Sequence, residues 1–383
     1  MVVLSRNGWP AAIVGPLLLL VACGATPPHV QEATPATASG SRAPEQAAVA
    51  AKTPAPEPYV AVASTSDVVA PFVRPERSSR LAVPLPKGRA RERWSAALDP
   101  KLDPVFVLCA GTRIVVQGRA AGPPTSRVGP FALLDTNGRR IQTGFFGGDL
   151  VHLRPTAGIF FGVGATESAS AHTLAAGTLV PDALRGADLH DLRGPNATSV
   201  VSHEGTRVTV QPSGVEIEPV GGGAPRTVVE PPVEALDASI DDLANLHVLV
   251  RQDKDLALWT TPLAGGSVGR VRIGPLRRNR ADTPPIVGGT LRVVVLDDRL
   301  VAYGRDGRLL WERKGALTGG ATLTSDDRLL VASDAKILAI DPAGRATEIA
   351  SAPKEVFLTA PILTANGLLV VASGSAVHAY AFE

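Results

Sequence analysis

The residue patterns in this chain that could do chemistry are few, and each also has a simpler structural interpretation. Residues 265–269 read GGSVG, which matches the G-x-S-x-G pattern around the nucleophile of serine hydrolases. That chemistry needs a strand before the serine and a helix after it, because a sharp strand-to-helix turn exposes the hydroxyl. The next residues, 270–273, read RVRI and alternate in polarity as a strand does. We therefore interpret the match as a flexible turn between strands.

Metal binding has no clear pattern either. The chain has seven histidines, but none forms an H-x-x-x-H pair, and no C-x-x-C occurs. The densest cluster is residues 188–191, DLHD, which could hold a cation, although turns of this composition are usually solvated. Asp237, Asp241 and Asp242 lack the spacing of a calcium-binding EF-hand loop. We expect no catalytic residue, no metal site and no cofactor.

An apolar segment near the N-terminus has the build of a secretory signal. One early positive charge, Arg6, precedes the apolar run 11–22, and small residues close that run before Cys23. A membrane-spanning helix needs about 20 apolar residues. This run is far shorter and contains Pro16. The pattern predicts a cleaved signal peptide rather than a membrane span.

Residues 20–23 read LVAC and resemble the lipobox of bacterial lipoproteins, in which a leucine, a small or aliphatic residue and a small residue precede a cysteine. The resemblance implies that the signal peptide, residues 1–22, is removed and that the sulfur of Cys23 carries a lipid such as palmitate. Gly24 stands where an aspartate favours retention in the inner membrane. The resemblance therefore favours the outer membrane of the cell envelope, on its periplasmic side or at the cell surface.

Composition limits what the rest of the chain can do. The formal net charge is +2 and aromatic residues make up 4%, so neither charge nor stacking surface favours nucleic acid. Residues 23–88 are rich in Ala and Pro and have no apolar period, so we expect a lipidated cysteine followed by a disordered tether. The basic positions from Arg74 to Arg93 are interpreted as a solvated linker end, with contact to anionic lipid or cell wall as the alternative. Cys109 lies in an apolar run and is expected to be a small buried residue without a disulfide partner.

From residue 89 onward the sequence is typical of strands and hairpins, because short aliphatic runs alternate with Gly and Asp-Gly turns. The clearest repeat lies near the C-terminus, where residues 329–333 (LLVAS) and 368–373 (LLVVAS) each lead into a further strand. A turn glycine recurs roughly every forty residues. These glycines are Gly138, Gly177, Gly222, Gly265, Gly307 and Gly344. An all-β chain with this period predicts a β-propeller of four-stranded blades, because each sheet buries its faces only against its neighbours.

Residues 361–380 and 303–311 resemble the pyrroloquinoline-quinone-like repeat. The first segment has a proline-led strand and an Asn-Gly turn, and the second has an Asp-Gly turn followed by Trp311. This is the blade type of the propeller lipoprotein of the outer-membrane β-barrel assembly machinery and of quinoprotein dehydrogenases. The resemblance implies a propeller over residues 89–383. It implies no cofactor, because those enzymes commonly use adjacent cysteines and a ring of tryptophans, whereas this chain has two separated cysteines and four tryptophans.

The last repeat stops after its third strand, at Glu383. Residues 93–98 read RWSAAL and resemble a fourth strand, with Trp94 in the place that Trp311 has in its own repeat. We therefore predict that this N-terminal strand completes the C-terminal blade and removes an exposed sheet edge. The expected ring has seven blades, within a range of six to eight.

These features favour a lipid-anchored envelope propeller that acts as a non-catalytic protein-interaction scaffold. Outer-membrane protein assembly is the process that the resemblance suggests, by analogy of fold alone. The alternative is a ligand- or glycan-binding, or enzymatic, propeller that uses its central channel. The expected partners are the membrane, through the lipid, and envelope proteins, with no nucleic acid, and a monomer is favoured.

Overall fold

The computed structural model describes most of the chain from residue 81 onward, and every described residue lies in the compact unit Ala55–Glu383. The described residues are 68–69, 81, 83–110, 112–119, 128–147, 150–154, 160–163, 171–175, 178–182, 198–202, 206–219, 223–275, 284–296, 299–315, 317–364 and 366–383. The predicted signal peptide and Cys23 lie outside them. Within these ranges all regular elements are strands and none is a helix.

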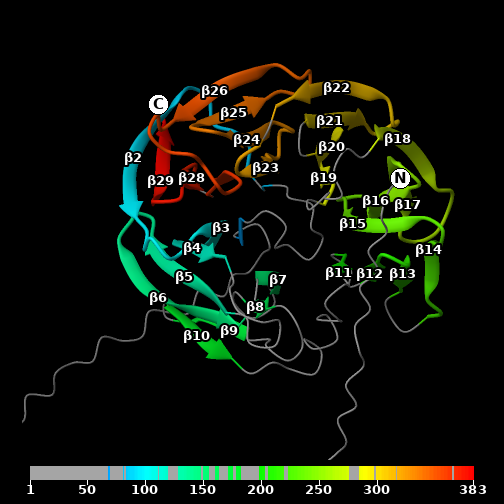
Figure 1. The fold of residues 1–383 in the computed structure, drawn as a ribbon, viewed down its shortest axis with the longest axis horizontal. Coiled ribbons are helices and arrows are strands. Elements are labelled where there is room, and N and C mark those ends of the chain that lie inside the picture. The colour runs from blue at the N-terminus through cyan, green and yellow to red at the C-terminus, as the bar shows by residue number, and fades with distance from the viewer. Residues whose placement is uncertain are drawn as a thin grey trace, which may run out of the picture. The chain divides into compact units, whose positions relative to one another are not determined.

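The described strands form seven antiparallel sheets that follow one another around a common centre (Figure 1). Blade 1 contains β3 (Pro104–Ala110), β4 (Arg113–Gly118), β5 (Val128–Asp135) and β6 (Arg140–Gly147), with the short β1 (Val68–Val69) beside β3. Blade 2 contains β7 (Leu150–Arg154), β8 (Phe160–Val163), β9 (Ala171–Ala175) and β10 (Thr178–Asp182). Blade 3 contains β11 (Thr198–Val201), β12 (Arg207–Gln211), β13 (Gly214–Glu218) and β14 (Arg226–Val229).

The second half of the unit repeats this plan. Blade 4 contains β15 (Glu234–Ile240), β16 (Asn245–Gln252), β17 (Asp255–Pro262) and β18 (Gly269–Pro275). Blade 5 contains β19 (Ile286–Val287), β20 (Leu291–Leu296), β21 (Arg299–Gly304) and β22 (Leu309–Lys314). Blade 6 contains β23 (Gly320–Leu323), β24 (Leu329–Ser333), β25 (Lys336–Ile340) and β26 (Ala346–Ser351). Blade 7 contains β27 (Ile362–Leu363), β28 (Leu369–Ala372), β29 (Ala376–Phe382) and, from the other end of the chain, β2 (Ala90–Ala97).

Burial explains why each blade depends on its neighbours. The inner strands β20 and β24 are almost wholly buried, whereas the outer strand β22 is almost wholly exposed. Continuous aliphatic runs suit the inner strands because both faces of the sheet are covered by the adjacent blades. Each Val or Leu buried there contributes about 1.5–3 kcal/mol. The seven sheets, each wound from an inner to an outer strand, confirm the predicted all-β propeller (Figure 1).

In blade 7 the strand from the N-terminal side takes the outer place. β2 pairs antiparallel with β29, from Ala90 opposite Phe382 to Ala97 opposite Ala376. His378 on β29 also approaches Glu92 on β2, with Nδ1 2.9 Å from Oε1. Glu92 and His378 are 286 positions apart in the sequence, so the two halves of this blade come from opposite ends of the propeller segment.

The segment just before β2 packs against the propeller, although the sequence analysis placed residues up to 88 in the disordered tether. The amide of Leu81 donates to Leu323 O at 2.6 Å, and the amide of Ser325 donates to Val83 O at 3.0 Å. Leu81 and Leu85 are buried in the core cluster that blades 6, 7 and 1 share. Their alternation with small residues and prolines forms a short apolar pattern, and burying it offsets the entropy that a free tether would keep.

Candidate functional site

Four of the predicted turn glycines lie between the third and fourth strands of their blades: Gly138 in blade 1, Gly265 in blade 4, Gly307 in blade 5 and Gly344 in blade 6. Gly138, Gly307 and Gly344 have φ angles of +82°, +78° and +85°, a left-handed conformation that glycine adopts without steric cost. The amide of Gly138 donates to Asp135 O at 3.0 Å, and that of Gly344 donates to Asp341 O at 2.8 Å. The repeat positions therefore form one recurring tight turn, whereas Gly177 and Gly222 lie outside the described residues.

Two tryptophans each lie against such a turn in the following blade. Trp94 of blade 7 donates its indole Nε1–H to a carbonyl of the blade 1 turn at 2.9 Å, and a Cβ atom on Gly138 would lie 2.6 Å from its ring. Trp311 of blade 5 donates to a carbonyl of the blade 6 turn at 3.2 Å, and a Cβ atom on Gly344 would lie 2.8 Å from it. The predicted glycine and tryptophan positions thus meet in pairs across two blade junctions, and their role there is packing.

The junction between blades 4 and 5 has a different arrangement. A Cβ atom on Gly307 would lie 2.7 Å from Cγ2 of Val271, so a valine takes the place of the tryptophan. The large aromatic side chain of blade 4, Trp259, instead carries the guanidinium of Arg270 over its ring at 4.2 Å. Val271 also belongs to an apolar cluster that joins the two blades and includes Leu249 of blade 4 and Val301 of blade 5.

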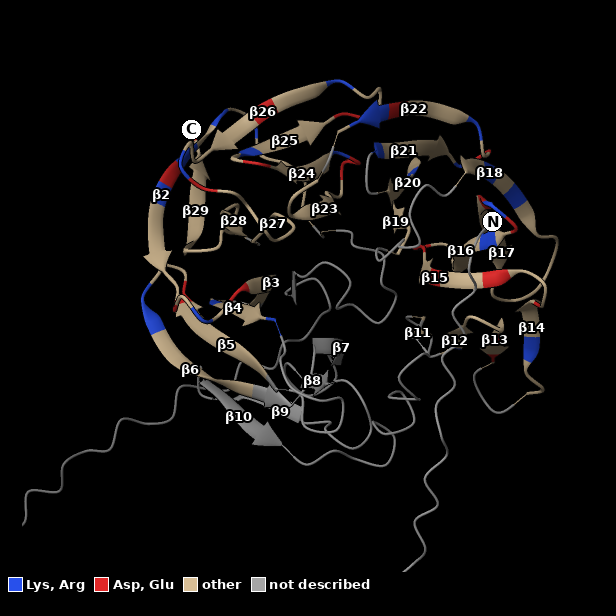
Figure 2. Ribbon diagram, in the orientation of Figure 1, with Lys and Arg blue, Asp and Glu red and all other residues tan. Residues whose placement is uncertain are grey.

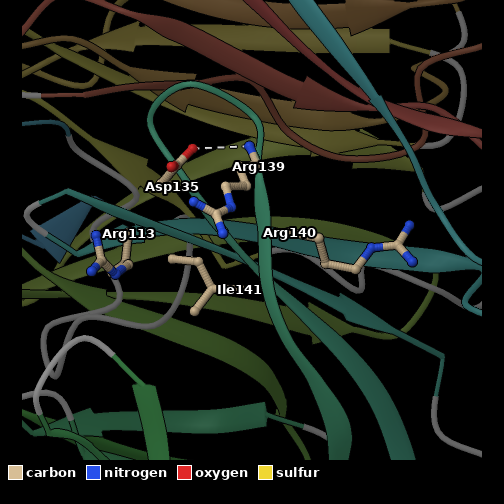
Figure 3. Close-up of a pocket in the computed structure, with 5 residues that line it drawn as sticks. All are labelled: Arg113, Asp135, Arg139, Arg140 and Ile141. Atoms are coloured by element: carbon tan, nitrogen blue, oxygen red, sulfur yellow. Dashed lines mark hydrogen bonds between the residues drawn. The ribbon is translucent and has the colours of Figure 1, made fainter.

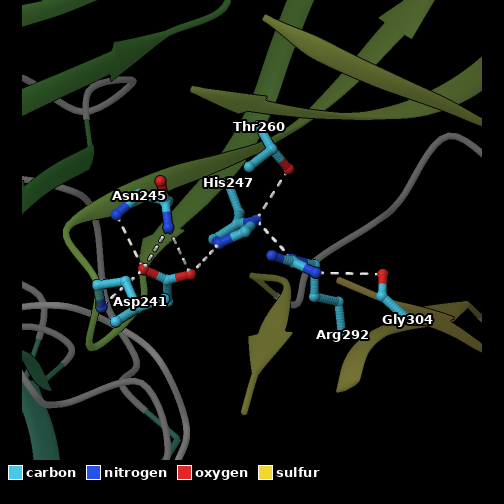
Figure 4. Close-up of polar contacts among 7 residues, drawn as sticks. Asp241, Asn245, His247, Thr260, Arg292 and Gly304 are labelled. Carbon is cyan, nitrogen blue, oxygen red and sulfur yellow. Dashed lines mark hydrogen bonds and ion pairs between the residues drawn. The ribbon is translucent and has the colours of Figure 1, made fainter. Parts of the chain in front are cut away.

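A buried polar cluster joins blades 4 and 5 closer to the centre (Figure 4). Asp241 follows β15, His247 lies on β16 and Thr260 on β17, while Arg292 comes from β20 of blade 5. His247 Nε2 lies 3.0 Å from Asp241 Oδ2, and its Nδ1 lies 3.0 Å from Thr260 Oγ1. Arg292 donates Nε–H to His247 Nδ1 at 3.3 Å, and it also donates to Gly304 O at 3.1 Å. Since Nδ1 accepts from Arg292, the imidazole proton lies on Nε2 and is donated to Asp241.

The electrostatics of this cluster follow from burial and these contacts. Burial lowers the pKa of His247, and the positive charge of Arg292 lowers it further, although the hydrogen bond to Asp241 acts in the opposite direction. Burial alone would raise the pKa of Asp241, but hydrogen bonds from His247 and the Asn245 amide hold it well below its ordinary value. Burial also lowers the pKa of Arg292. The resting cluster is therefore an aspartate, a neutral imidazole and a guanidinium.

The chain of Thr260, His247 and Asp241 has the connectivity of a nucleophile, a base and an orienting carboxylate. Its position argues against catalysis, because His247 is 0% exposed and Arg292 occupies the nitrogen that would have to receive the proton. Each polar group instead forms a hydrogen bond with another group that is buried beside it. The cluster is therefore a staple between two blades. Asp241 and His247 were considered from the sequence only as metal ligands, and no sequence signal pointed to Arg292.

The other sequence candidates also have structural roles where they are described. Ser267 lies in the connection between β17 and β18, and β18 is a strand, so the G-x-S-x-G match is the predicted turn. Asp237 accepts the amide of Ala238 at 2.8 Å. Across the described ranges, no three His, Cys, Asp or Glu side chains are grouped as metal ligands. Residues 188–191 lie outside those ranges.

A basic hollow of about 340 Å³ opens at one end of blade 1 and is the candidate binding site (Figure 3). Its lining residues are Arg113, Asp135, Arg139, Arg140 and Ile141. Oδ1 of Asp135 accepts the amides of Asn137 and Arg139, both at 2.9 Å. Arg140 donates to Ala97 O in blade 7. Because the single carboxylate holds the turn's own amides, the hollow presents mainly positive charge, and an anion is the ligand that its chemistry suits.

Of the two cysteines, Cys109 is among the described residues and Cys23 is not. Cys109 on β3 is 1% exposed, and burial raises the pKa of its thiol far above the ordinary value, which confirms a small buried residue rather than a reactive thiol. Cys23, the predicted lipid attachment site, lies outside the described residues. In the part of the chain that is described, no helix is long and apolar enough to cross a membrane.

No protein-family model matches the sequence, and no curated protein matches it. Among solved structures, a streptogramin B lyase is 12% identical over 76% of this chain and 98% of its own, with a TM-score of 0.46. BamB from Moraxella catarrhalis is 12% identical over 76% of this chain and 100% of its own, with a TM-score of 0.43. BBS1N, from a complex with ARL6DN, is 10% identical over 78% of this chain and 98% of its own, with a TM-score of 0.49. At these values no residue role, ligand or partner transfers to this chain, and the propeller assignment rests on its own seven sheets.

Proposed function

We propose that this chain is a lipid-anchored β-propeller of the bacterial cell envelope that acts as a non-catalytic scaffold for other envelope proteins. The lipid attachment at Cys23 and the outer-membrane location are supported by residues 20–23 and by Gly24. Outer-membrane protein assembly is the process favoured by the repeat resemblance. The anchor would hold the propeller at the membrane, and its strand connections would contact the partner.

The scaffold role is supported mainly by the buried polar side chains, which link blades and strands to one another. The staple of Asp241, His247 and Arg292 joins blade 4 to blade 5. In blade 7, His378 lies between Ser373, with Nε2 3.2 Å from its hydroxyl, and Glu92 on the other half of the blade. These groups hold blades and strands together, so the accessible chemistry of the described blades lies in their charged turns. Binding residues commonly lie on loops that a rigid scaffold positions, and this supports a recognition role.

Crosslinking with mass spectrometry in native membranes tests this role. Lysines at one end of the blades, Lys101, Lys254, Lys336 and Lys354, are exposed there for amine-reactive reagents. We expect reproducible crosslinks from this end of the full chain to envelope proteins, and loss of these crosslinks in Cys23→Ser, which removes the acylated sulfur. Absence of protein crosslinks, together with a thermal shift on adding a sugar or a redox cofactor, would instead favour the ligand-binding or enzymatic alternative.

A further inference from the structure

A Gly-Arg pair recurs at the same turn in four successive blades. The pairs are Gly138-Arg139 in blade 1, Gly307-Arg308 in blade 5, Gly344-Arg345 in blade 6 and Gly88-Arg89 in blade 7. In blade 6 the amide before the turn, Asp341 N, donates to Arg345 O at 3.0 Å. In blade 7 Glu383 N donates in the same way to Arg89 O at 3.4 Å, although the two strands are not consecutive in the sequence. The arginines therefore occupy equivalent positions along an arc of blades.

This arc lies at the end of each sheet that carries the turn from the first to the second strand and the turn from the third to the fourth. In an antiparallel sheet wound in chain order these two turns share one end. We name it the turn end, and the opposite one the loop end. Figure 2 shows Lys and Arg distributed on the outer strands and their turns around the propeller. The hollow of Arg113, Arg139 and Arg140 also lies at the turn end, since it is lined by the start of β4, the end of β5 and the start of β6.

Carboxylates are present at the turn end, but several of them are turned inward. Asp327 is 6% exposed and accepts the amides of Gly289 and Thr290, at 2.8 and 2.6 Å. Asp341 accepts the amides of Ala343 and Arg345, at 3.0 and 2.9 Å. Their hydrogen bonds cap the turns.

The arginine side chains, by contrast, extend into solvent. That of Arg345 is 84% exposed and that of Arg89 is 71% exposed. Their ion pairs, with Asp341 and Glu348, are surface pairs and hold the guanidinium groups only weakly. Exposed arginines at the turn end outnumber the exposed carboxylates, which include Asp242, Asp306 and Asp326.

Large apolar side chains are also exposed at the turn end. Leu243, in the first turn of blade 4, is 60% exposed, and Leu309 and Leu310, directly after the Gly-Arg pair of blade 5, are 51% and 44% exposed. Ile141, at the rim of the basic hollow, is 37% exposed. Exposed leucines next to basic groups are the composition of surfaces that bind a membrane interface, where apolar groups enter the headgroup region and cations attract anionic lipid.

The N-terminal part of the chain also reaches the propeller at the turn end. Leu81 bonds to Leu323, the last residue of β23, and Val83 bonds to Ser325 in the turn that follows. Leu85 donates its amide to Asp326 Oδ1 at 3.0 Å in the same turn. The lipid anchor of the proposed function would therefore connect to the propeller at this end.

We infer that the turn end of the propeller, with its arc of exposed arginines and its exposed leucines, docks on an anionic membrane surface. The arginines would contact lipid phosphates and the leucines would enter the headgroup layer. The loop end, with its exposed lysines, would then face away from the membrane and remain open to protein partners. This docking goes beyond the scaffold role, because it needs no partner protein.

Photo-crosslinking on vesicles tests the docking. A benzophenone amino acid is placed at position 243 or 309 at the turn end, or at 356 at the loop end, where Val356 is 50% exposed and serves as the matched apolar control. The full chain is mixed with vesicles of phosphatidylcholine alone or of phosphatidylcholine with phosphatidylglycerol. The readout is the mass of lipid added to the protein. We expect severalfold more lipid adduct from 243 and 309 than from 356, only with phosphatidylglycerol, and a loss of that excess in high salt.

Charge variants separate docking from general attraction. Arg308→Glu combined with Arg345→Glu should remove most of the lipid adduct, whereas Lys336→Glu combined with Lys354→Glu at the loop end should leave it unchanged. Equal adducts from both ends, or adducts that ignore phosphatidylglycerol or the arginine variant, would overturn the inference. So would adducts in native envelopes that join 243 and 309 to protein instead of lipid, which would make the turn end a docking surface for an acidic protein. Vesicles contain no partner protein, so this result stands apart from the crosslinking test of the scaffold role.

Discussion

The junction of blades 4 and 5 and the junction of blades 5 and 6 meet the same packing requirement with different chemistry. Between blades 5 and 6, Trp311 covers the turn glycine Gly344 and bonds to a carbonyl of that turn. Between blades 4 and 5, Val271 touches the equivalent glycine, and a buried cluster of His247 and Arg292 joins the blades further in. The contact of Trp311 with its turn is mainly apolar, whereas the junction of blades 4 and 5 combines an apolar cluster with buried charge.

This difference predicts which substitutions at each junction should destabilise the fold most. An apolar contact loses energy in proportion to the area that a substitution exposes. A buried ion and its partners lose far more when one member is removed, because the remaining charge is left without compensation. The cluster around His247 therefore resembles a catalytic site in its connectivity, although its interactions stabilise the fold.

Removing the strand that closes blade 7 should have the largest effect. Deletion of residues 89–99 removes β2, exposes the edge of β29 and takes away Trp94 from the blade 1 turn. We expect a loss of several kcal/mol in the free energy of unfolding and one cooperative transition at a much lower temperature. Thermal and urea unfolding by circular dichroism measure this, with a deletion inside residues 30–60 as the control. A truncated chain that melts like the full chain would show that β2 does not hold the ring together.

Breaking the buried cluster should come next. Asp241→Ala leaves Arg292 and His247 buried without their carboxylate, so we expect a loss of about 3 kcal/mol. Glu216→Ala, which removes an exposed carboxylate from β13 of blade 3, is the control and should change stability by less than about 0.5 kcal/mol. Urea unfolding measures both. Similar small effects of the two substitutions would remove the distinction between the polar and the apolar junction.

The tryptophan junction should lose less. Trp311 is half-buried, so Trp311→Ala should cost about 2 kcal/mol, while Val271→Ala at the equivalent place should cost about 1 kcal/mol. Chemical unfolding of the two variants gives the ratio. If the valine variant lost more than the tryptophan variant, the rim contacts would not be equivalent in the way that their turns are.

Acidification should have the smallest effect and should act at the polar junction. The folded protein disfavours the imidazolium of His247, whose pKa is lowered by burial and by Arg292. The unfolded chain then takes up the proton more readily, so the free energy of unfolding should fall as the pH falls below about 6.5. The part that His247 contributes is the difference between the wild type and His247→Gln, followed by urea unfolding across this range. A difference that stays constant with pH would contradict a neutral imidazole in the cluster.

The repeat could be predicted from the sequence because the strands and turns of one blade are consecutive in the chain. Turn glycines such as Gly307 and Gly344, each required by a left-handed backbone, stand close to the strands they connect and can be recognised in one segment. The buried cluster could not be predicted in the same way, because Asp241 and Arg292 come from different blades and meet only when the ring forms. The packing of Leu81 and Leu85 was not predicted for another reason. The prolines and small residues around them have the composition of a disordered tether.

The interpretation of the buried cluster as a staple between blades, rather than as a reactive site, is tested most directly by a double-mutant cycle between His247 and Arg292. Their contact crosses from blade 4 to blade 5, so the coupling free energy measures the interaction of the two blades through this pair alone. We predict that His247→Ala and Arg292→Ala are non-additive, with a coupling of at least about 1 kcal/mol in urea unfolding. Additive effects within about 0.3 kcal/mol would contradict the staple, because they would mean that the two side chains act independently.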